Sequence, residues 1–340
     1  MQSQSPSLGE FALIERFFKT QSQAMLAANK NSIALGIGDD CALLTPNPDE
    51  YIAITSDMLV EGRHFLAGAN PEYLGHKALA VNLSDLAAMG AKPLGFTLAL
   101  ALPAADPQWL EAFSKGLFAI ANTYSCPLIG GDTTSGPLNI CITAFGAIPK
   151  GKAFTRSGAL DGDDIWISGT VGDARLTLAA LRHEILLTKS DLDCVQSRMH
   201  QPNPRIQLGM ALRGIASAAL DISDGLLGDL KHILEQSKKD ADVFLGQLPK
   251  SSTLLKQESA LQDQFAACGG DDYELCFTAS SLQRSTIEGI SNALDLPLTR
   301  IGHILPMHNT EVSISLITSD GEHLNDIETA ALLKSFDHFA

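Results

Sequence analysis

Acidic residues beside glycine, serine or threonine recur in the first 135 residues of the chain. They form four clusters: Gly36-Ile-Gly-Asp-Asp40, Thr55-Ser-Asp57, Asn82-Leu-Ser-Asp-Leu-Ala-Ala-Met-Gly90 and Gly130-Gly-Asp-Thr-Thr134. Carboxylates, phosphate oxygens and water are the usual ligands of Mg²⁺ in proteins, and glycine lets the backbone approach a ligand closely. The combination suits several hard cations held around a polyphosphate. It therefore favours a magnesium-dependent phosphotransferase.

Two further acidic clusters lie in the second half of the chain, Asp221-Ile-Ser-Asp-Gly225 and Gly269-Gly-Asp-Asp-Tyr-Glu-Leu275. A single Gly-Asp pair is weak evidence, since both residues are good turn formers. Several carboxylates that converge without a cation would repel one another, so a convergent set implies a metal. We therefore predict a shared cation site in which Mg²⁺ binding requires Asp57 and Asp85.

Motifs for other kinds of catalysis are missing or incomplete. Residues 146–152 match the spacing of a phosphate-binding P-loop, but Ala153 stands where the magnesium-binding hydroxyl should be. The sequence has neither a Gly-x-Ser-x-Gly elbow nor a His-Glu-x-x-His pair, so no residue that forms a covalent intermediate is predicted. Two residues stay open on sequence grounds. His64 is either a loop histidine or a ligand contact, and Arg156 either binds a phosphate or forms a surface salt bridge.

Hydrophobic periodicity predicts alternating strands and helices around these clusters. In the first half, we expect strands at residues 34–40, 51–55, 96–102, 127–129 and 138–148, and helices at 10–18, 71–89 and 109–123. Asp57 and Asp132 then follow strand ends. In the second half, we expect strands at 165–168 and 275–278, two more within 299–317, and helices at 173–187, 204–219 and 225–235. The alternation indicates an α/β or α+β fold.

The bulk composition is that of an ordinary globular protein. A length of 340 residues favours about two domains, and the Gly-, Lys- and Asp-rich segment 149–164 suggests a boundary between residues 1–149 and 150–340. A net charge of −15 disfavours binding to nucleic acid or to anionic membranes. No apolar signal segment is found, and the longest apolar run, 94–105, is too short to span a bilayer. The six cysteines lack metal-site spacing, so we expect buried free thiols and a cytoplasmic location.

Taken together, the motifs resemble the thiamine-monophosphate kinase family, which belongs to the PurM-like superfamily of ATP-dependent synthetases and kinases. The resemblance is carried, in order, by residues 36–44, 55–65, 82–93, 130–134, 155–158, 221–226 and 269–275. It implies an N-terminal α/β domain, residues 1–149, that binds Mg²⁺ and ATP and contributes strands to a dimer-spanning β-barrel. It also implies a C-terminal α/β domain, residues 150–340, that closes over nucleotide and substrate. A homodimer is expected from the resemblance alone.

The resemblance also implies roles for individual residues. The positions that match magnesium ligands are Asp40, Thr55, Ser56, Asp57, Asp85, Asp132, Asp221 and Asp224. The positions that match nucleotide contacts are Gly131, Asp132, Arg156 and Ser223. The positions that match substrate contacts are His64, Glu274 and Phe336, the last being an aromatic residue expected to stack on thiamine.

The reaction implied is ATP-dependent phosphorylation of thiamine monophosphate to thiamine diphosphate. The acceptor is a phosphate oxygen that is already anionic near neutral pH, so no strong general base is required. Several Mg²⁺ ions would reduce the repulsion between the two polyanions, and we expect direct in-line transfer without a phosphoenzyme. Two alternatives remain at this point: another PurM-like ATP-dependent synthetase, and a non-catalytic sensor that binds nucleotide or metal.

Overall fold

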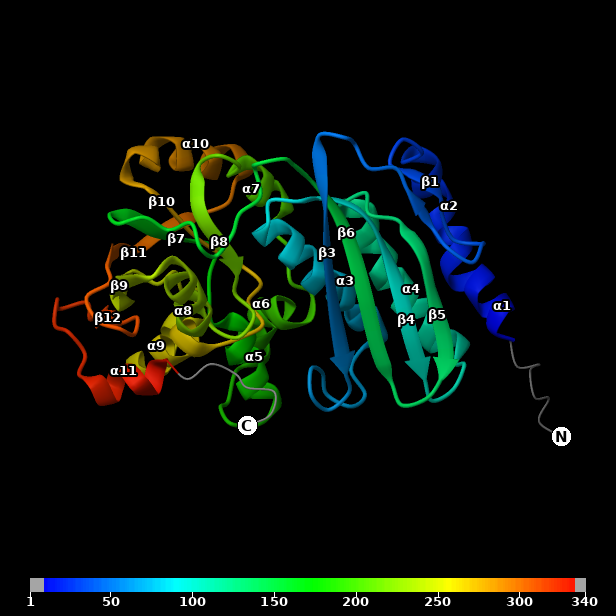
Figure 1. The fold of residues 1–340 in the computed structure, drawn as a ribbon. Coiled ribbons are helices and arrows are strands. Elements are labelled where there is room, and N and C mark those ends of the chain that lie inside the picture. The colour runs from blue at the N-terminus through cyan, green and yellow to red at the C-terminus, as the bar shows by residue number, and fades with distance from the viewer. Residues whose placement is uncertain (1–8, 334–340) are drawn as a thin grey trace. The chain divides into compact units, whose positions relative to one another are not determined.

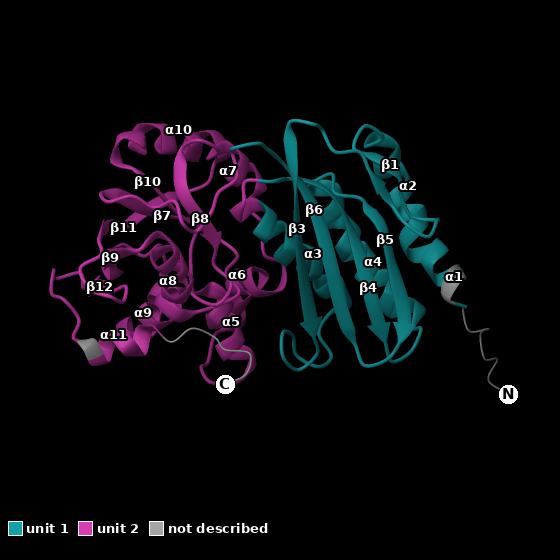
Figure 2. Cartoon of the chain, viewed as in Figure 1, with its two compact units in different colours: residues 1–86, 91–151 teal, residues 87–90, 152–340 magenta. Residues whose placement is uncertain are grey.

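The computed structural model describes residues 9–333 of the chain. The chain divides into two compact units, shown in Figure 2. Unit 1 consists of Met1–Leu86 and Ala91–Gly151, and unit 2 consists of Ala87–Gly90 and Lys152–Ala340. Within residues 9–333, every helix is too short or too polar to cross a membrane.

Unit 1 is built on a four-stranded sheet in the order β3 (Glu50–Val60), β6 (Asn139–Pro149), β4 (Lys92–Leu102) and β5 (Leu128–Ser135). Neighbouring strands are antiparallel except β4 and β5, which are parallel. Helices α3 (Pro71–Ala88) and α4 (Pro107–Thr123) lie together behind the sheet in Figure 1. Their buried stripes include Leu79 and Leu83 of α3 and Phe113 and Leu117 of α4, none of which is exposed. These residues form the core between helices and sheet.

Helices α3 and α4 pack backbone against backbone at Gly116. A Cβ atom at this position would lie 1.8 Å from the carbonyl oxygen of Glu72, so only glycine allows the approach. Lys115 and Glu72 form an ion pair of 2.9 Å beside the contact. Asp106 caps α4 by accepting a hydrogen bond from the Gln108 N–H at 2.9 Å. The position of α3 matters for the site because α3 carries Asp85.

The N-terminal segment of unit 1 is helical for longer than the sequence pattern predicts. It comprises α1 (Glu10–Ile14), a π-helical segment (Glu15–Lys19) and α2 (Thr20–Ala28), whereas the prediction ended at residue 18. The hydroxyl of Ser22 donates to the carbonyl of Leu128 on β5 at 2.7 Å. A short hairpin of β1 (Ile33–Leu35) and β2 (Leu43–Leu44) follows.

Unit 2 contains a six-stranded sheet in the order β12 (Ile314–Ile317), β9 (Lys239–Phe244), β11 (Leu298–Pro306), β7 (Asp163–Ser168), β10 (Leu275–Ser280) and β8 (Ala216–Asp221). Only the β12–β9 pair is parallel among these strands of the described chain. The helices are α5 (Asp173–Leu181), α6 (Lys189–His200), α7 (Ile206–Ala211), α8 (Leu226–Ser237), α9 (Ser259–Cys268), α10 (Arg284–Leu294) and α11 (Asp326–Leu332). Leu230 and Ile233 of α8 are fully buried in one apolar cluster with Ile165 and Ile167 of β7.

The mixed α/β class predicted from the sequence is confirmed, but several element boundaries were wrong. Strand β3 runs to Val60 and β5 to Ser135, so Asp57 and Asp132 lie within strands, not after them. The helix predicted at 204–219 covers only Ile206–Ala211, and β8 begins at Ala216 after a turn. Pairing with β10 decides that segment, since tertiary hydrogen bonding overrides a helical pattern. The six cysteines are free as predicted, but only Cys126 and Cys276 are buried. Cys141 and Cys268 are partly buried, and Cys41 and Cys194 are exposed.

Candidate active site

In unit 1, the structure brings Thr55, Asp57 and Asp85 together on the helix-covered side of the sheet. The hydroxyl of Thr55 on β3 donates a hydrogen bond to the carboxylate of Asp85 on α3. Because side chains alternate along a strand, Asp57 shares the face of Thr55. Both carboxylates are partly buried. Burial and, secondly, the negative charge of Asp85 raise the pKa of Asp57 from 3.8 to about 7.

The donor set at this pair fits Mg²⁺. Two carboxylates that repel each other in a half-buried position are stabilised in their ionised form by a divalent cation. Within residues 9–333, no group of three or more His, Cys, Asp or Glu side chains is arranged to hold a metal ion. The protein would therefore supply two carboxylates here, which matches the preference of Mg²⁺ for one or two carboxylates with phosphate oxygens and water.

Other predicted magnesium and nucleotide positions of unit 1 lie on other elements or on the other face of β3. The side chain of Ser56 is on the opposite face of β3, where its hydroxyl lies 3.0 Å from the Thr143 hydroxyl. Asp40 is exposed in the connection between β1 and β2. Asp132 is exposed on β5, in register with Ala99 of β4. Gly131 precedes it with a φ of +150°.

His64 lies in the turn that follows β3. Its ring nitrogen Nδ1 accepts a hydrogen bond from the backbone N–H of Val60 at 3.0 Å, and the backbone N–H of His64 donates back to the Val60 carbonyl at 3.0 Å. These two bonds fix the imidazole relative to the end of β3. Because Nδ1 is the acceptor, the neutral ring carries its proton on Nε2.

In unit 2, the two acidic turns are joined by backbone hydrogen bonds. The N–H of Asp271 donates to the carbonyl of Ser223, and the N–H of Tyr273 donates to the carbonyl of Ile222, each at 2.8 Å. The N–H of Ile222 in turn donates to the carbonyl of Glu274 at 2.8 Å. The pairing continues the β8–β10 ladder beyond Asp221 and Leu275. The structure thus brings the predicted residues Asp221, Ser223 and Asp224 beside the segment that carries Glu274.

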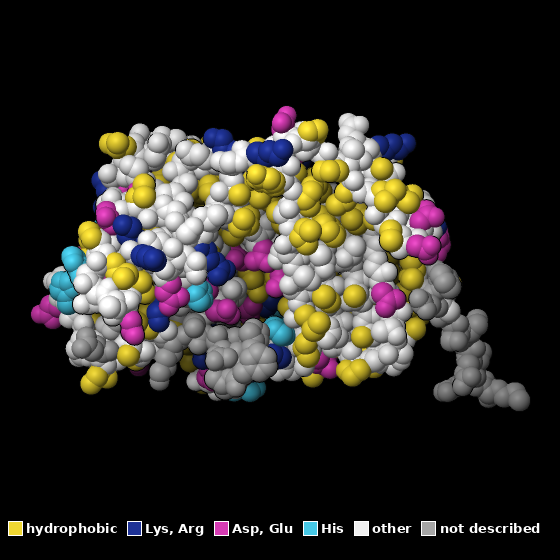
Figure 3. Space-filling model, in the orientation of Figure 1, with side chains coloured by type: hydrophobic (Ala, Val, Ile, Leu, Met, Phe, Trp, Pro, Cys, Tyr) yellow, Lys and Arg dark blue, Asp and Glu magenta, His cyan; other side chains and the backbone are white. Residues whose placement is uncertain are grey.

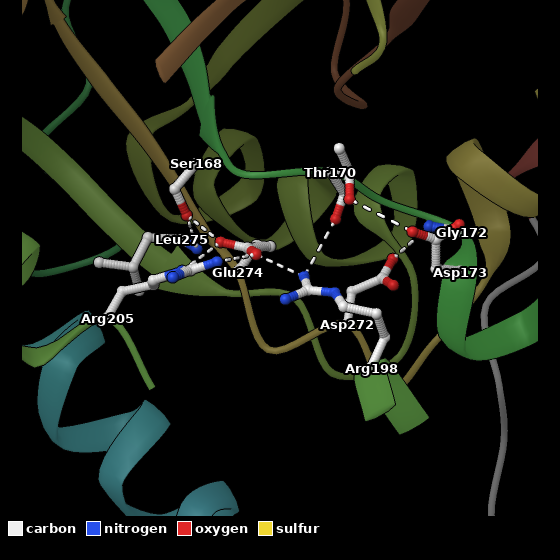
Figure 4. Close-up of polar contacts among 9 residues, drawn as sticks. All are labelled: Ser168, Thr170, Gly172, Asp173, Arg198, Arg205, Asp272, Glu274 and Leu275. Carbon is white, nitrogen blue, oxygen red and sulfur yellow. Dashed lines mark hydrogen bonds and ion pairs between the residues drawn. The ribbon is translucent and has the colours of Figure 1, made fainter. Parts of the chain in front are cut away.

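Glu274 is fully enclosed by hydrogen-bond donors, as Figure 4 shows. Arg205 binds its carboxylate with two nitrogens, the Nε bond measuring 2.6 Å. Arg198 and the Ser168 hydroxyl also donate to it. A carboxylate with no exposed surface and two guanidinium partners is an anchor for the backbone around it. The predicted contact between Glu274 and substrate stays a prediction.

Asp272 and Asp173 extend this network. Asp272 is 1% exposed, and its Oδ2 accepts a hydrogen bond from the Gly172 N–H at 2.8 Å. Its Oδ1 is buried and has no hydrogen-bond partner among the described residues. Burial raises the pKa of Asp272 well above its usual range, although the charge of Arg198 opposes this rise. Asp173 accepts from the Ser251 hydroxyl at 2.6 Å, and burial raises its pKa as well.

Arg156 and Phe336 are the last two of the predicted site residues. Arg156 is exposed, and its carbonyl accepts a hydrogen bond from the Ser237 hydroxyl at 2.8 Å. Phe336 lies outside the described residues.

Sequence reasoning missed the residues that hold the site segments in place, chiefly Arg198, Arg205 and Ser168. Arg198 and Arg205 flank the segment Gln201-Pro-Asn-Pro204. Two arginines around a Pro-rich turn carry no local catalytic pattern. Only the fold brings them to Glu274, which is 76 and 69 residues away in the chain.

Comparison with known protein families indicates the class of the N-terminal part of the chain. Residues 38–148 match the family described as AIR synthase related protein, N-terminal domain. This match covers most of unit 1, including β3, α3, β4, β5 and β6. Unit 1 is therefore similar to AIR-synthase-related domains.

Whole-chain relatives narrow the class to one family. The chain is 44% identical to thiamine-monophosphate kinase of Salmonella typhimurium over 338 residues, which is 98% of both proteins. The crystal structure of thiamine-monophosphate kinase from Stenotrophomonas maltophilia K279a is 44% identical, with a TM-score of 0.83 over 93% of this chain and 98% of that one. A structure described as AaThiL complexed with AMPPCP and TMP is 29% identical, with a TM-score of 0.73 over 98% and 97%. The chain belongs to the thiamine-monophosphate kinase family, which confirms the resemblance drawn from the motifs.

Proposed function

We propose that the protein transfers the γ-phosphoryl group of ATP to the phosphate of thiamine monophosphate, forming ADP and thiamine diphosphate. The observation that carries this proposal is the 44% identity to a thiamine-monophosphate kinase over 98% of both proteins. The related structure described with AMPPCP and TMP supports the same pair of substrates. The acceptor is an anionic phosphate oxygen, so the task of the protein is to position two polyanions and to offset their repulsion.

Mg²⁺ is the cation we propose for this site. Thr55, Asp57 and Asp85 are the best-supported positions because they lie together. Asp40, Ser56, Asp132, Asp221 and Asp224 are proposed from their match to the family motifs. When bound, Mg²⁺ would neutralise charge on the phosphate groups and on the developing leaving group.

The contacts to nucleotide and substrate are proposals of the same kind. Gly131, Asp132, Arg156 and Ser223 are proposed nucleotide contacts, and His64, Glu274 and Phe336 are proposed substrate contacts. For Glu274, whose carboxylate is enclosed by arginines, we propose that the contact is made through the backbone segment that it anchors. Residues 1–149 would then serve Mg²⁺ and ATP binding, and residues 150–340 would add contacts to both substrates. A cytoplasmic location stays a prediction.

The direct test is ³¹P NMR of the protein with ATP, Mg²⁺ and thiamine monophosphate. ADP and a new diphosphate signal are expected, and both should be absent when EDTA is added. ATP left intact, with the fold verified by circular dichroism, would refute the proposal. Transfer from ATP carrying a chiral γ-phosphorus tests the mechanism further. Inversion is expected for direct in-line transfer, whereas retention would indicate a phosphoenzyme.

We also propose a homodimer formed through the open face of the four-stranded sheet. Thr55 and Asp57 face the helices, so Ile54 and Met58 point to the other side, where they are 65% and 53% exposed. Their partners in register on β6 are Phe145 and Cys141. Figure 3 shows hydrophobic side chains gathered over β3 and β6. An exposed apolar sheet face of this kind is typical of a protein–protein interface.

A further inference from the structure

A single carboxylate in unit 2 accepts three consecutive backbone N–H groups. Oδ2 of Asp229, in the first turn of α8, accepts hydrogen bonds from the N–H groups of Ser223 at 3.0 Å, Asp224 at 3.1 Å and Gly225 at 3.2 Å. Asp229 is 6% exposed. Its own N–H donates to the Gly225 carbonyl at 2.9 Å, so the loop and the helix start are tied in both directions. Convergent N–H groups of this kind form an anion-binding nest, and here the chain fills the nest with its own side chain.

The loop held in this way is one to which the proposed function assigns ligand contacts. It joins β8 to α8, carries Ser223 and Asp224, and directly follows Asp221 at the end of β8. On its other side, the Ser223 carbonyl accepts from the Asp271 N–H of the second acidic turn. The loop is therefore fixed between a carboxylate on one side and a neighbouring backbone on the other. Its N–H groups at 223, 224 and 225 are already used within the protein.

We propose that Asp229 is a positioning residue for phosphoryl transfer. Asp229 holds the Ser223–Gly225 loop by its backbone N–H groups, so the loop engages the nucleotide through side chains and cations instead. The inference rests on the proposed function for the identity of the ligand. Most phosphate-binding loops after a strand offer their N–H groups directly to phosphate. In this loop, the carboxylate of Asp229 occupies the place that a phosphate oxygen would take. What remains for a phosphate-bearing ligand is the hydroxyl of Ser223 and the carboxylates of Asp221 and Asp224, and carboxylates approach phosphate only through a cation.

The test compares Asp229→Ala, Asp229→Asn and the wild-type protein. Asp191→Ala serves as the matched control, because Asp191 also lies in the first turn of a unit 2 helix, where it accepts from the Thr188 hydroxyl at 2.8 Å. The first measurement is amide hydrogen exchange at residues 223–225 without ligand. The second is the affinity for AMPPCP, with and without Mg²⁺, by isothermal titration. The third is steady-state kinetics over a range of Mg²⁺ concentrations.

We expect Asp229→Ala to exchange faster at residues 223–225 while the rest of unit 2 keeps its protection. It should bind Mg²⁺–AMPPCP more weakly and lower kcat/KM about 100-fold, with most of the loss in kcat, since small displacements of positioning groups act on the transition state. Asp229→Asn keeps an acceptor oxygen and should recover activity to within about tenfold of wild type. Asp191→Ala should leave all three measurements unchanged.

Two results would overturn the proposal. One is a folded Asp229→Ala protein whose amides at 223–225 have lost protection from exchange but which binds Mg²⁺–AMPPCP as tightly as the wild type. If Asp229→Ala does not fold, Asp229→Asn is judged by the same criterion. The other is tighter binding of AMPPCP without Mg²⁺ in Asp229→Ala, which would show that the nest is a phosphate site that Asp229 blocks. If the proposed function is wrong, the wild-type protein will not turn over thiamine monophosphate. In that case, the exchange and titration measurements still decide the role of Asp229.

Discussion

The carboxylates of Asp57 on β3 and Asp85 on α3 share one side of the four-stranded sheet, and burial together with the charge of Asp85 raises the pKa of Asp57 to about 7. The folded protein thus holds a carboxylate that is costly to ionise unless a cation is present. This relationship connects the stability of the metal-free protein to the proposed binding of Mg²⁺.

Asp57→Asn should stabilise the metal-free protein at pH 8. The pKa of Asp57 rises from 3.8 to about 7 on folding, so the folded state binds this proton more tightly than the unfolded state. The contribution of the protonated Asp57 carboxyl to the free energy of unfolding is therefore complete below about pH 4 and is lost as the pH rises to about 7. Removing the charge should raise the free energy of unfolding at pH 8 by roughly 4 kcal/mol, with little change at pH 4. Urea denaturation in EDTA at both pH values measures this, and an equal effect at the two values would contradict it.

The same substitution should weaken metal-dependent ligand binding. Asp57→Asn removes one of two carboxylates available to Mg²⁺ on this face, so the affinity for Mg²⁺–nucleotide should fall by at least about tenfold. Isothermal titration of both proteins with Mg²⁺ and AMPPCP provides the measurement. Unchanged affinity would remove Asp57 from the proposed magnesium positions.

Glu274→Gln should destabilise unit 2 strongly. The substitution removes the negative charge that Arg198 and Arg205 share and leaves two partly buried guanidinium groups without their charged partner. Breaking a buried ion pair in this way typically costs about 3–5 kcal/mol. Glu288→Gln on α10 is the control, because Glu288 is exposed and should change the free energy of unfolding by less than about 0.5 kcal/mol. Similar denaturation curves for the two variants would contradict the anchoring role.

Gly131→Ala and Gly130→Ala should differ sharply although the residues are adjacent on β5. A Cβ atom at Gly131 would lie 1.9 Å from the Leu98 carbonyl oxygen, and its φ of +150° disfavours other residues. A Cβ atom at Gly130 would meet only the Thr97 methyl group, at 3.8 Å. Gly131→Ala should therefore lose about 2 kcal/mol or more of stability and bind nucleotide poorly. Thermal unfolding and AMPPCP titration compare the pair, and equal tolerance would show that β5 can adjust.

Ile54→Lys should dissociate the proposed homodimer. Ile54 lies on the edge strand β3 of this sheet face. A lysine charge there cannot be buried in an interface without a partner, so the variant should elute as a monomer. Leu186→Lys is the control, since Leu186 is 94% exposed in unit 2 and lies outside that face. Size-exclusion chromatography with light scattering gives the mass of each species. A wild-type monomer, or a dimer that survives the Ile54 substitution, would exclude this face as the interface.

The sequence alone was sufficient for the family, the α/β class and the acidic clusters, because glycine, aspartate and hydroxyl residues occur there in local patterns that carry their own chemistry. It also predicted helices α3, α4 and α8 closely, since their apolar stripes follow the helical period. Asp57 and Asp85 could be selected from the sequence as candidate metal ligands, and the fold places them on one side of the sheet.

Other features were decided only by tertiary structure. Ser56 and Asp57 are neighbours in the chain, yet alternation along β3 sends them to opposite faces once the strand continues to Val60. Arg198 and Arg205 carry no motif, and only the packing of unit 2 brings them to Glu274. Asp229 is an ordinary helix residue by pattern, and its role depends on a loop that folds back over it. Local chemistry can be read from adjacent residues, whereas the pairing of charges across the chain depends on which surfaces are buried together.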